Sequence, residues 1–251
     1  APLAGFIVLK FGWVDFIYFL CLLLLIIMPC TFILRSRLEE NDNSDAHVVG
    51  LKKTLSIAFK TPSYIYLVSG FFVCGFHVQF IQTHLPAYVI DEGLAPIVGA
   101  WSLALIGLFN IAGSFLSGWS GQIYSKPKLL AGIYASRALV IAIFIFTPLS
   151  GVSVLIFSAA MGILWLSTVP LTTSLIAQTQ GLKFLSTLAG LVFFSHQVGG
   201  FLGAWLGGRL YDISGNYEAM WIAAILFGLL ATLIHLPIRE QAGRLAQAEF
   251  K

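Results

Sequence analysis

The stretch YIYLVSGFFVCGFHVQFIQTHLPAYVI, residues 64–90, decides the fold. It is apolar almost throughout and exceeds the roughly 20 residues that a helix needs to cross a membrane. Its second half nevertheless carries His77, Gln79, Gln82 and His84. At about 100° per residue, the two histidines share one helix face and the two glutamines share another. Polar groups are costly in lipid, so we expect one face toward a cavity and one toward neighbouring helices.

The composition of the whole chain agrees with a membrane location. Of 251 residues, 58% are hydrophobic and 10% are charged, and the mean hydropathy is +0.90. A soluble domain carries roughly 25% charged residues. The net charge of +3 indicates membrane orientation rather than nucleic-acid binding. We therefore expect a polytopic membrane protein whose partners are the lipid bilayer and a small-molecule substrate, and no nucleic acid.

Long apolar stretches recur along the chain after a short apolar segment at residues 2–9. Lipid offers nothing to satisfy an open sheet edge, so these spans are predicted to be helices and the fold class is all-α membrane. The predicted spans are residues 13–34, 64–90, 97–122, 128–149, 152–176, 184–209 and 217–238.

Basic residues predict the orientation of these spans. Lysine and arginine gather in alternate connections, at 35–63, 123–128, near Lys183 and in the tail from Arg239. The intervening connections hold only Lys10 and Arg209. We expect the protein to lie in the cell (inner) membrane, with its basic side and its C-terminus in the cytoplasm.

The long polar connection divides the chain into four predicted parts. Residues 1–34 are expected to end an N-terminal bundle, 35–63 to form a cytoplasmic linker, 64–240 to form a six-helix transport bundle, and 241–251 to form a cytoplasmic tail. A single span before a linker suggests the end of a matching bundle. We therefore expect that the N-terminal half of the same protein is missing from this chain.

A six-span bundle behind a basic cytoplasmic linker resembles the C-terminal half of a major facilitator superfamily transporter. The segment GSFLSGWSGQIYSKPK, residues 113–128, is similar to the second copy of that family's loop motif. Gly118 and Gly121 fit the motif, and so do two lysines, Lys126 and Lys128. Gln122 stands where close relatives often have an acidic residue, which departs from the motif's charge relay.

A second motif, GGRLYDISGNYEAMW at residues 207–221, resembles the monocarboxylate-transporter-like branch, which includes proton-linked carriers and an oxalate–formate exchanger. Carriers of this branch place an aspartate and an arginine where this chain has Asn110 and Ser114. The exchanger's lysine before a glycine pair corresponds to His196 in SHQVGG, which also contributes Gln197.

The resemblance implies a secondary transporter that works by alternating access and moves a small organic anion, such as a carboxylate, by proton symport or exchange. Two alternatives stay open: efflux of a neutral or amphipathic compound, which the lost charged pair favours, and a non-transporting sensor with the same fold.

Polar and aromatic side chains near the middle of the spans are the candidates for substrate binding and translocation. They are His77, Gln79, Gln82, Asn110, Arg137, Trp165, His196 and Gln197. No Asp or Glu lies at this depth, so His77 and His196 are the candidate proton carriers. Arg137 has two interpretations: it contacts an anionic substrate, or it bonds to carbonyls or to Asn110 and holds adjacent helices together.

Small residues indicate close helix packing and conformational change. Gly199, Gly203 and Gly207 repeat every four residues and allow helices to approach closely. Gly118 and Gly121 join them as candidate packing residues, and Pro170 predicts a break beside Trp165. The sequence shows no nucleotide loop, metal cluster or nucleophile constellation. We therefore expect no cofactor, no metal and no enzymatic activity.

Overall fold

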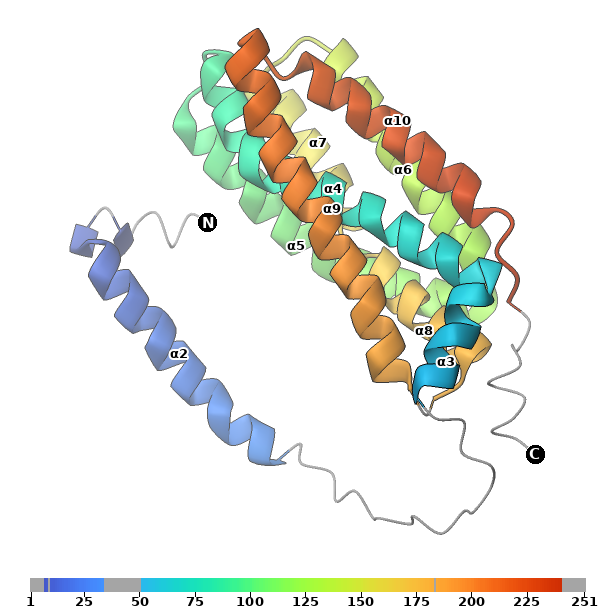
Figure 1. Ribbon diagram of the computed structural model, residues 1–251. Coiled ribbons are helices and arrows are strands. Elements are labelled where there is room, and N and C mark those ends of the chain that lie inside the picture. Colours follow the sequence, from blue (N-terminus) through green and yellow to red (C-terminus); the bar gives the residue numbers. More distant parts are fainter. Residues whose placement is uncertain (1–6, 9, 34–50, 183, 241–251) are drawn as a thin grey trace. The chain divides into compact units, whose positions relative to one another are not determined.

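The computed structural model describes residues 7–8, 10–33, 51–182 and 184–240 (Figure 1). These residues form helices and connections without a strand, which confirms the all-α membrane fold class. The first part of the predicted linker, residues 35–50, lies outside the described residues, as do Lys183 and the tail 241–251. The helices are α2 (Trp13–Ile33), α3 (Leu51–Lys60), α4 (Pro62–Asp91), α5 (Pro96–Ile123), α6 (Lys126–Phe146), α7 (Gly151–Leu164), α8 (Thr168–Gln180), α9 (Leu185–Ser214) and α10 (Glu218–His235).

The chain divides into two compact units, Ala1–Val49 and Gly50–Lys251. In the first unit, α2 coincides with the predicted span at 13–34. Its described side chains, such as Tyr18 and Leu24, are largely exposed, and Asp15 lies in its first turn.

The second unit contains six helical stretches long and apolar enough to span a membrane. They are α4, α5, α6, the pair α7–α8, α9 and α10, and they match the six spans predicted from 64 onward. Lys126 and Lys128 at the start of α6 mark one end of this bundle, here called the basic end. Asp91 of α4 and Glu218 of α10 mark the opposite, acidic end.

Helix α3 belongs to the second unit although its residues fall inside the predicted linker. Thr54 and Ala58 are buried, and the Phe59 ring meets Tyr64 of α4 edge-on at 5.7 Å. A charged, amphipathic helix of ten residues resembles a linker in composition, and its buried face becomes visible only against α4. The compact bundle therefore begins at Gly50 rather than at residue 64.

Three helix pairs make the most extensive contacts: α4 with α9, α5 with α7, and α6 with α10. Between membrane helices these contacts depend on van der Waals packing and hydrogen bonds, since lipid tails are as apolar as leucine. An aromatic cluster fills the core toward the acidic end. The rings of Phe144 and Phe157 stack at 4.1 Å, and Trp221 meets Phe80 edge-on at 4.8 Å.

At the basic end, the segment after α10 is tied to the starts of two helices. The Glu240 carboxylate accepts a hydrogen bond from the backbone N–H of Lys126 at 2.6 Å. The backbone N–H of Arg239 donates to the Ser63 hydroxyl at 3.2 Å. A carboxylate at the start of α6 compensates one of the N–H groups that a helix leaves unpaired at its N-terminus.

Candidate functional site

The span formed by α7 and α8 is broken near its middle. Helix α7 ends at Leu164, α8 begins at Thr168, and Trp165–Ser167 lie between them. Pro170 explains the break, because its ring has no N–H and collides with the carbonyl four residues earlier. Val169 donates to Leu166 instead, at 2.9 Å, in the tighter pattern of a first turn. The break predicted beside Trp165 is therefore present as a local feature of the structure.

Arg137 of α6 binds the carbonyl groups that this break releases. It is fully buried, and its Nε and Nη2 donate to the Leu164 carbonyl at 3.2 and 2.6 Å. Nη2 also donates to the Trp165 carbonyl. The guanidinium lies 5.2 Å from the centre of the Tyr134 ring. These carbonyls form the negative end of the α7 dipole, which favours a cation there.

Asn110 of α5 binds a backbone N–H group at the same break. Its Oδ1 accepts the backbone N–H of Leu166 at 3.0 Å and the Ser114 hydroxyl at 3.3 Å. Together, Asn110 and Arg137 satisfy three backbone groups that an unbroken helix would pair internally. The structure thus brings Asn110, Arg137 and Trp165 together, as parts of one helix break.

Trp165 itself is 7% exposed, so its side chain packs inside the bundle. Thr168 and Thr172 of α8 are buried too. The Thr168 hydroxyl lies 3.3 Å from the sulfur of Cys74 on α4. The start of α8 is therefore linked to α4 through Cys74.

The seam between α4 and α9 is built on glycines. A Cβ at Gly199 would lie 2.0 Å from the Phe72 carbonyl oxygen, and one at Gly203 would lie 2.4 Å from that of Phe76. Gly207 leaves space for the ring of His84, whose Nε2 lies 2.8 Å from the Ala204 carbonyl oxygen. The backbones of the two helices therefore touch at Gly199 and Gly203, whereas at Gly207 the His84 ring lies between them.

Gly118 and Gly121 of α5 face α8. A Cβ at Gly118 would lie 3.8 Å from the Pro170 ring, and one at Gly121 would lie 2.5 Å from a Leu171 methyl group. Both contacts are with side chains, so α5 and α8 approach each other less closely than α4 and α9 do.

His77 lies inside the bundle, at the contact between α4 and α10. It is fully buried, and its Nε2 lies 2.7 Å from the Ala224 carbonyl oxygen. Gly228 of α10 leaves space for the same ring. Among the residues that the structure describes, none is a hydrogen-bond partner of its Nδ1. His77 therefore sits apart from the exposed polar side chains of α4.

Those exposed polar side chains flank the α4–α9 seam. We define the polar face as Gln79, Gln82 and Thr83 of α4 with His196 and Gln197 of α9. Each is half-buried or exposed. The Gln79 amide donates to the Thr83 hydroxyl at 3.1 Å, and His196 Nδ1 lies 3.1 Å from Gln197 Oε1. The polar groups of this face bond to one another locally, which leaves hydrogen-bonding capacity for water or a solute.

One buried polar cluster toward the basic end is not among the residues predicted from the sequence. His235 of α10 stacks on Tyr134 at 4.9 Å between centroids, and the Tyr134 hydroxyl donates to the Gly70 carbonyl at 2.7 Å. A Cβ at Gly70 would lie 1.9 Å from the His235 ring. The available signal was the pairing of a glycine on one span with a histidine at the end of another.

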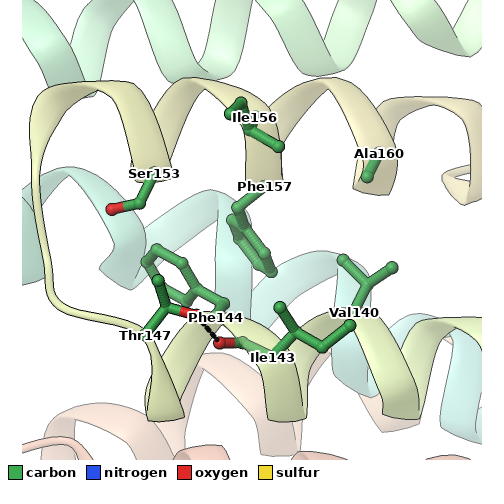
Figure 2. A pocket seen from close by; sticks show the side chains of 8 residues that line it. All are labelled: Val140, Ile143, Phe144, Thr147, Ser153, Ile156, Phe157 and Ala160. Carbon is green, nitrogen blue, oxygen red and sulfur yellow. Dashed lines mark hydrogen bonds between the residues drawn. The ribbon is translucent and has the colours of Figure 1, made fainter.

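An apolar cavity of about 240 Å³ opens elsewhere, between α6 and α7 toward the acidic end (Figure 2). Phe144 and Phe157 form its floor, and Ile143 and Ile156 stand at its exposed rim. Figure 2 shows the Thr147 hydroxyl bonded to the Ile143 carbonyl, at 2.6 Å, rather than pointing freely into the space. No predicted site residue lines this cavity, so it is separate from the polar face.

Comparisons with known proteins give the family. The family model of the Major Facilitator Superfamily matches residues 1–204. The uncharacterized MFS-type transporter YcxA of Bacillus subtilis (strain 168) is 27% identical over 175 residues, covering 68% of this chain and 42% of the relative. Monocarboxylate transporter 13 of Rattus norvegicus is 30% identical over 178 residues, which cover 64% of this chain and 39% of the relative. Monocarboxylate transporter 11 of Mus musculus is 24% identical over 245 residues, which cover 94% of this chain and 55% of the relative. The chain thus spans between about two fifths and just over half the length of these relatives.

Proposed function

Because this chain belongs to the Major Facilitator Superfamily, we propose that it supplies one bundle of a secondary transporter for a small organic anion, a carboxylate. The monocarboxylate-transporter-like branch indicated by residues 207–221 is confirmed by its relatives. Proteins of this family are transporters rather than enzymes, and this one is a multi-pass membrane protein.

The observation that carries the proposal is the polar face across the α4–α9 seam. Gln82 and Gln197 are exposed near the middle of long apolar helices, where a lipid contact would leave their amides unpaired. Such a face is stable when it borders a water-filled pathway between two bundles. We propose that the second bundle is an N-terminal half of the same protein, because the chain spans only about two fifths to just over half the length of its relatives.

Within this face, His196 is the proposed site of proton coupling or anion attraction. Imidazole changes charge near neutral pH, and an imidazolium attracts a carboxylate. Gln197 Oε1 lies 3.1 Å from His196 Nδ1, a contact that holds the orientation of the ring. Transport would then proceed by proton symport or by exchange, through alternating access.

Efflux of a neutral or amphipathic compound is the second candidate, and one observation favours it. Asn110 is neutral, and the Arg137 guanidinium is fully buried against backbone carbonyls, so neither presents an exposed charge to a substrate in this conformation. A pathway lined by amides and one histidine suits a neutral solute as well.

The experiment uses the complete polypeptide that carries this bundle, reconstituted in proteoliposomes. Uptake of radiolabelled formate, acetate, lactate and oxalate is measured with and without an inward proton gradient. Saturable uptake of one of these acids supports the proposal. No uptake of any acid, together with saturable movement of a neutral amphipathic dye, would favour the alternative.

We further propose that the protein lies in the cell (inner) membrane with its basic end and C-terminus in the cytoplasm. Lysines at the starts of α3 and α6 support this orientation. A reporter fused to the C-terminus that is active only in the cytoplasm tests this orientation. Activity of a C-terminal reporter that works only in the periplasm would show the opposite orientation.

A further inference from the structure

Two side chains from two other helices form hydrogen bonds to the break between α7 and α8. Arg137 of α6 donates to the Leu164 and Trp165 carbonyls, and Asn110 of α5 accepts from the Leu166 N–H. A backbone group left unpaired at membrane depth costs several kcal/mol. These bonds therefore remove the main penalty of interrupting the span.

Burying the charged side chain of Arg137 costs more free energy than a purely structural hydrogen bond requires. The residue is fully buried, and within the described part of the chain its Nη1 has no hydrogen-bond partner and no carboxylate forms an ion pair with it. A continuous apolar helix would fill the same place without burying a charge. Because the break is maintained although it requires a buried charge, we infer that it has a role in the transport cycle.

The contacts on the two sides of the break differ in kind. On the α7 side, a Cβ at Gly113 of α5 would lie 1.9 Å from the Ile163 carbonyl oxygen, so backbone touches backbone. On the α8 side, Gly118 and Gly121 meet only the Pro170 ring and a Leu171 methyl group. The Leu171 contact adjusts by a rotamer change and the Pro170 contact is at an ordinary van der Waals distance, whereas a close backbone contact fixes two helices together.

We propose that Arg137 and Asn110 are positioning residues that hold the span open at Trp165–Ser167, so that α8 moves separately from α7 during transport. Helix α7 stays with α5, and α8 swings about the break. Arg137 and Asn110 keep the ends of the break satisfied while the angle between the two half-helices changes. Only the transport readout of this proposal rests on the proposed function.

The first test separates positioning from substrate binding by transport kinetics. Arg137→Met and Asn110→Leu are expected to lower Vmax for the transported carboxylate about tenfold while KM changes by less than about twofold. Arg137→Lys, which still donates to one carbonyl, is expected to recover part of Vmax. Ser158→Ala is the matched control, because it removes a buried hydroxyl bonded within α7 itself. A large rise in KM with Vmax preserved would make Arg137 a substrate ligand and overturn the proposal.

The second test needs no substrate. The three native cysteines are replaced, and nitroxide labels are placed at Val152→Cys on α7 and Ser174→Cys on α8, both exposed positions. Pulsed electron paramagnetic resonance then gives the distance distribution across the break. We expect a distribution that broadens in Arg137→Lys, while a control pair at Ile111→Cys and Val152→Cys keeps one narrow distance.

An across-break distribution that is narrow and identical in the parent and Arg137→Lys would overturn the proposal. If the parent protein transports no carboxylate but the across-break distance distribution changes in Arg137→Lys, the proposed substrate is wrong and the proposal that α8 moves separately from α7 is supported.

Discussion

Arg137 and Leu164 meet near the middle of the bundle, where Nε and Nη2 of the guanidinium donate to the same carbonyl oxygen at 3.2 and 2.6 Å. This contact joins α6 to the last residue of α7. A carbonyl at a helix C-terminus carries the negative end of the helix dipole, so it is a favourable partner for a cation. The relationship explains how a basic residue is accommodated at membrane depth although no described carboxylate lies beside it.

His196→Gln is predicted to abolish the stimulation of carboxylate uptake by an inward proton gradient. Glutamine keeps a polar side chain beside Gln197 but does not change charge with pH. Uptake by exchange, measured with the same acid on both sides, should continue. The measurement is initial uptake rate at several imposed pH differences. Proton stimulation that survives in this variant would remove His196 from the coupling mechanism.

His77→Ala is predicted to lower stability rather than proton coupling. The substitution removes a fully buried ring and its bond to the Ala224 carbonyl. Large-to-small replacements in packed cores cost about 2–5 kcal/mol. Thermal unfolding in detergent, monitored by tryptophan fluorescence, should show a lower midpoint, with proton stimulation retained in the surviving fraction. An unchanged midpoint with lost proton stimulation would place His77 in the pathway instead.

Gly203→Leu is predicted to disrupt the α4–α9 seam. Even its Cβ would lie 2.4 Å from the Phe76 carbonyl oxygen, so the helices must separate. Overpacking of this kind costs about 1–3 kcal/mol and sometimes more. Gly190→Ala, on the same helix with nothing within 4 Å of its Cβ, is the control. Melting temperatures of the two variants are compared, and equal values would show that the seam is looser than described.

Glu240→Ala is predicted to destabilise the start of α6, because it removes the acceptor for the Lys126 N–H. Loss of a helix-capping acceptor costs about 0.5–2 kcal/mol. Glu240→Gln retains a side-chain oxygen and should lose less. Arg239→Ala is the control, since Arg239 bonds through its backbone and its side chain is exposed. Hydrogen exchange in the peptide covering 126–134 reports the effect, and equal protection in all three variants would contradict it.

The sequence predicted the spans well because their signal is local. A helix that crosses lipid must be apolar over its whole length, so the bounds of α4–α10 follow from runs of residues such as 64–90. Pro170 likewise indicated the break by its own chemistry. Helix α3 was harder to predict, because ten residues with three lysines resemble a linker until Thr54 and Ala58 are seen against α4.

The sequence could not predict which polar groups face inward. Helical periodicity separated His77 from the two glutamines of α4, but burial against α10 and exposure to a pathway require the same residue types. The partner of Arg137 was equally hidden, because backbone carbonyls have no sequence signature and become available only where the helix is interrupted. The fit of His235 against Gly70 depends on two residues far apart in the chain.

The central claim is that the polar face of α4 and α9 borders an aqueous pathway. Its most direct test is thiol labelling of Gln82→Cys by a membrane-impermeant, water-soluble maleimide, in the complete polypeptide with its native cysteines replaced. Leu226→Cys on α10, which is 61% exposed on an apolar helix, is the comparison. The account predicts rapid labelling at Gln82→Cys, slowed by the transported carboxylate, and no labelling at Leu226→Cys. Labelling that is equally absent at both positions would contradict it.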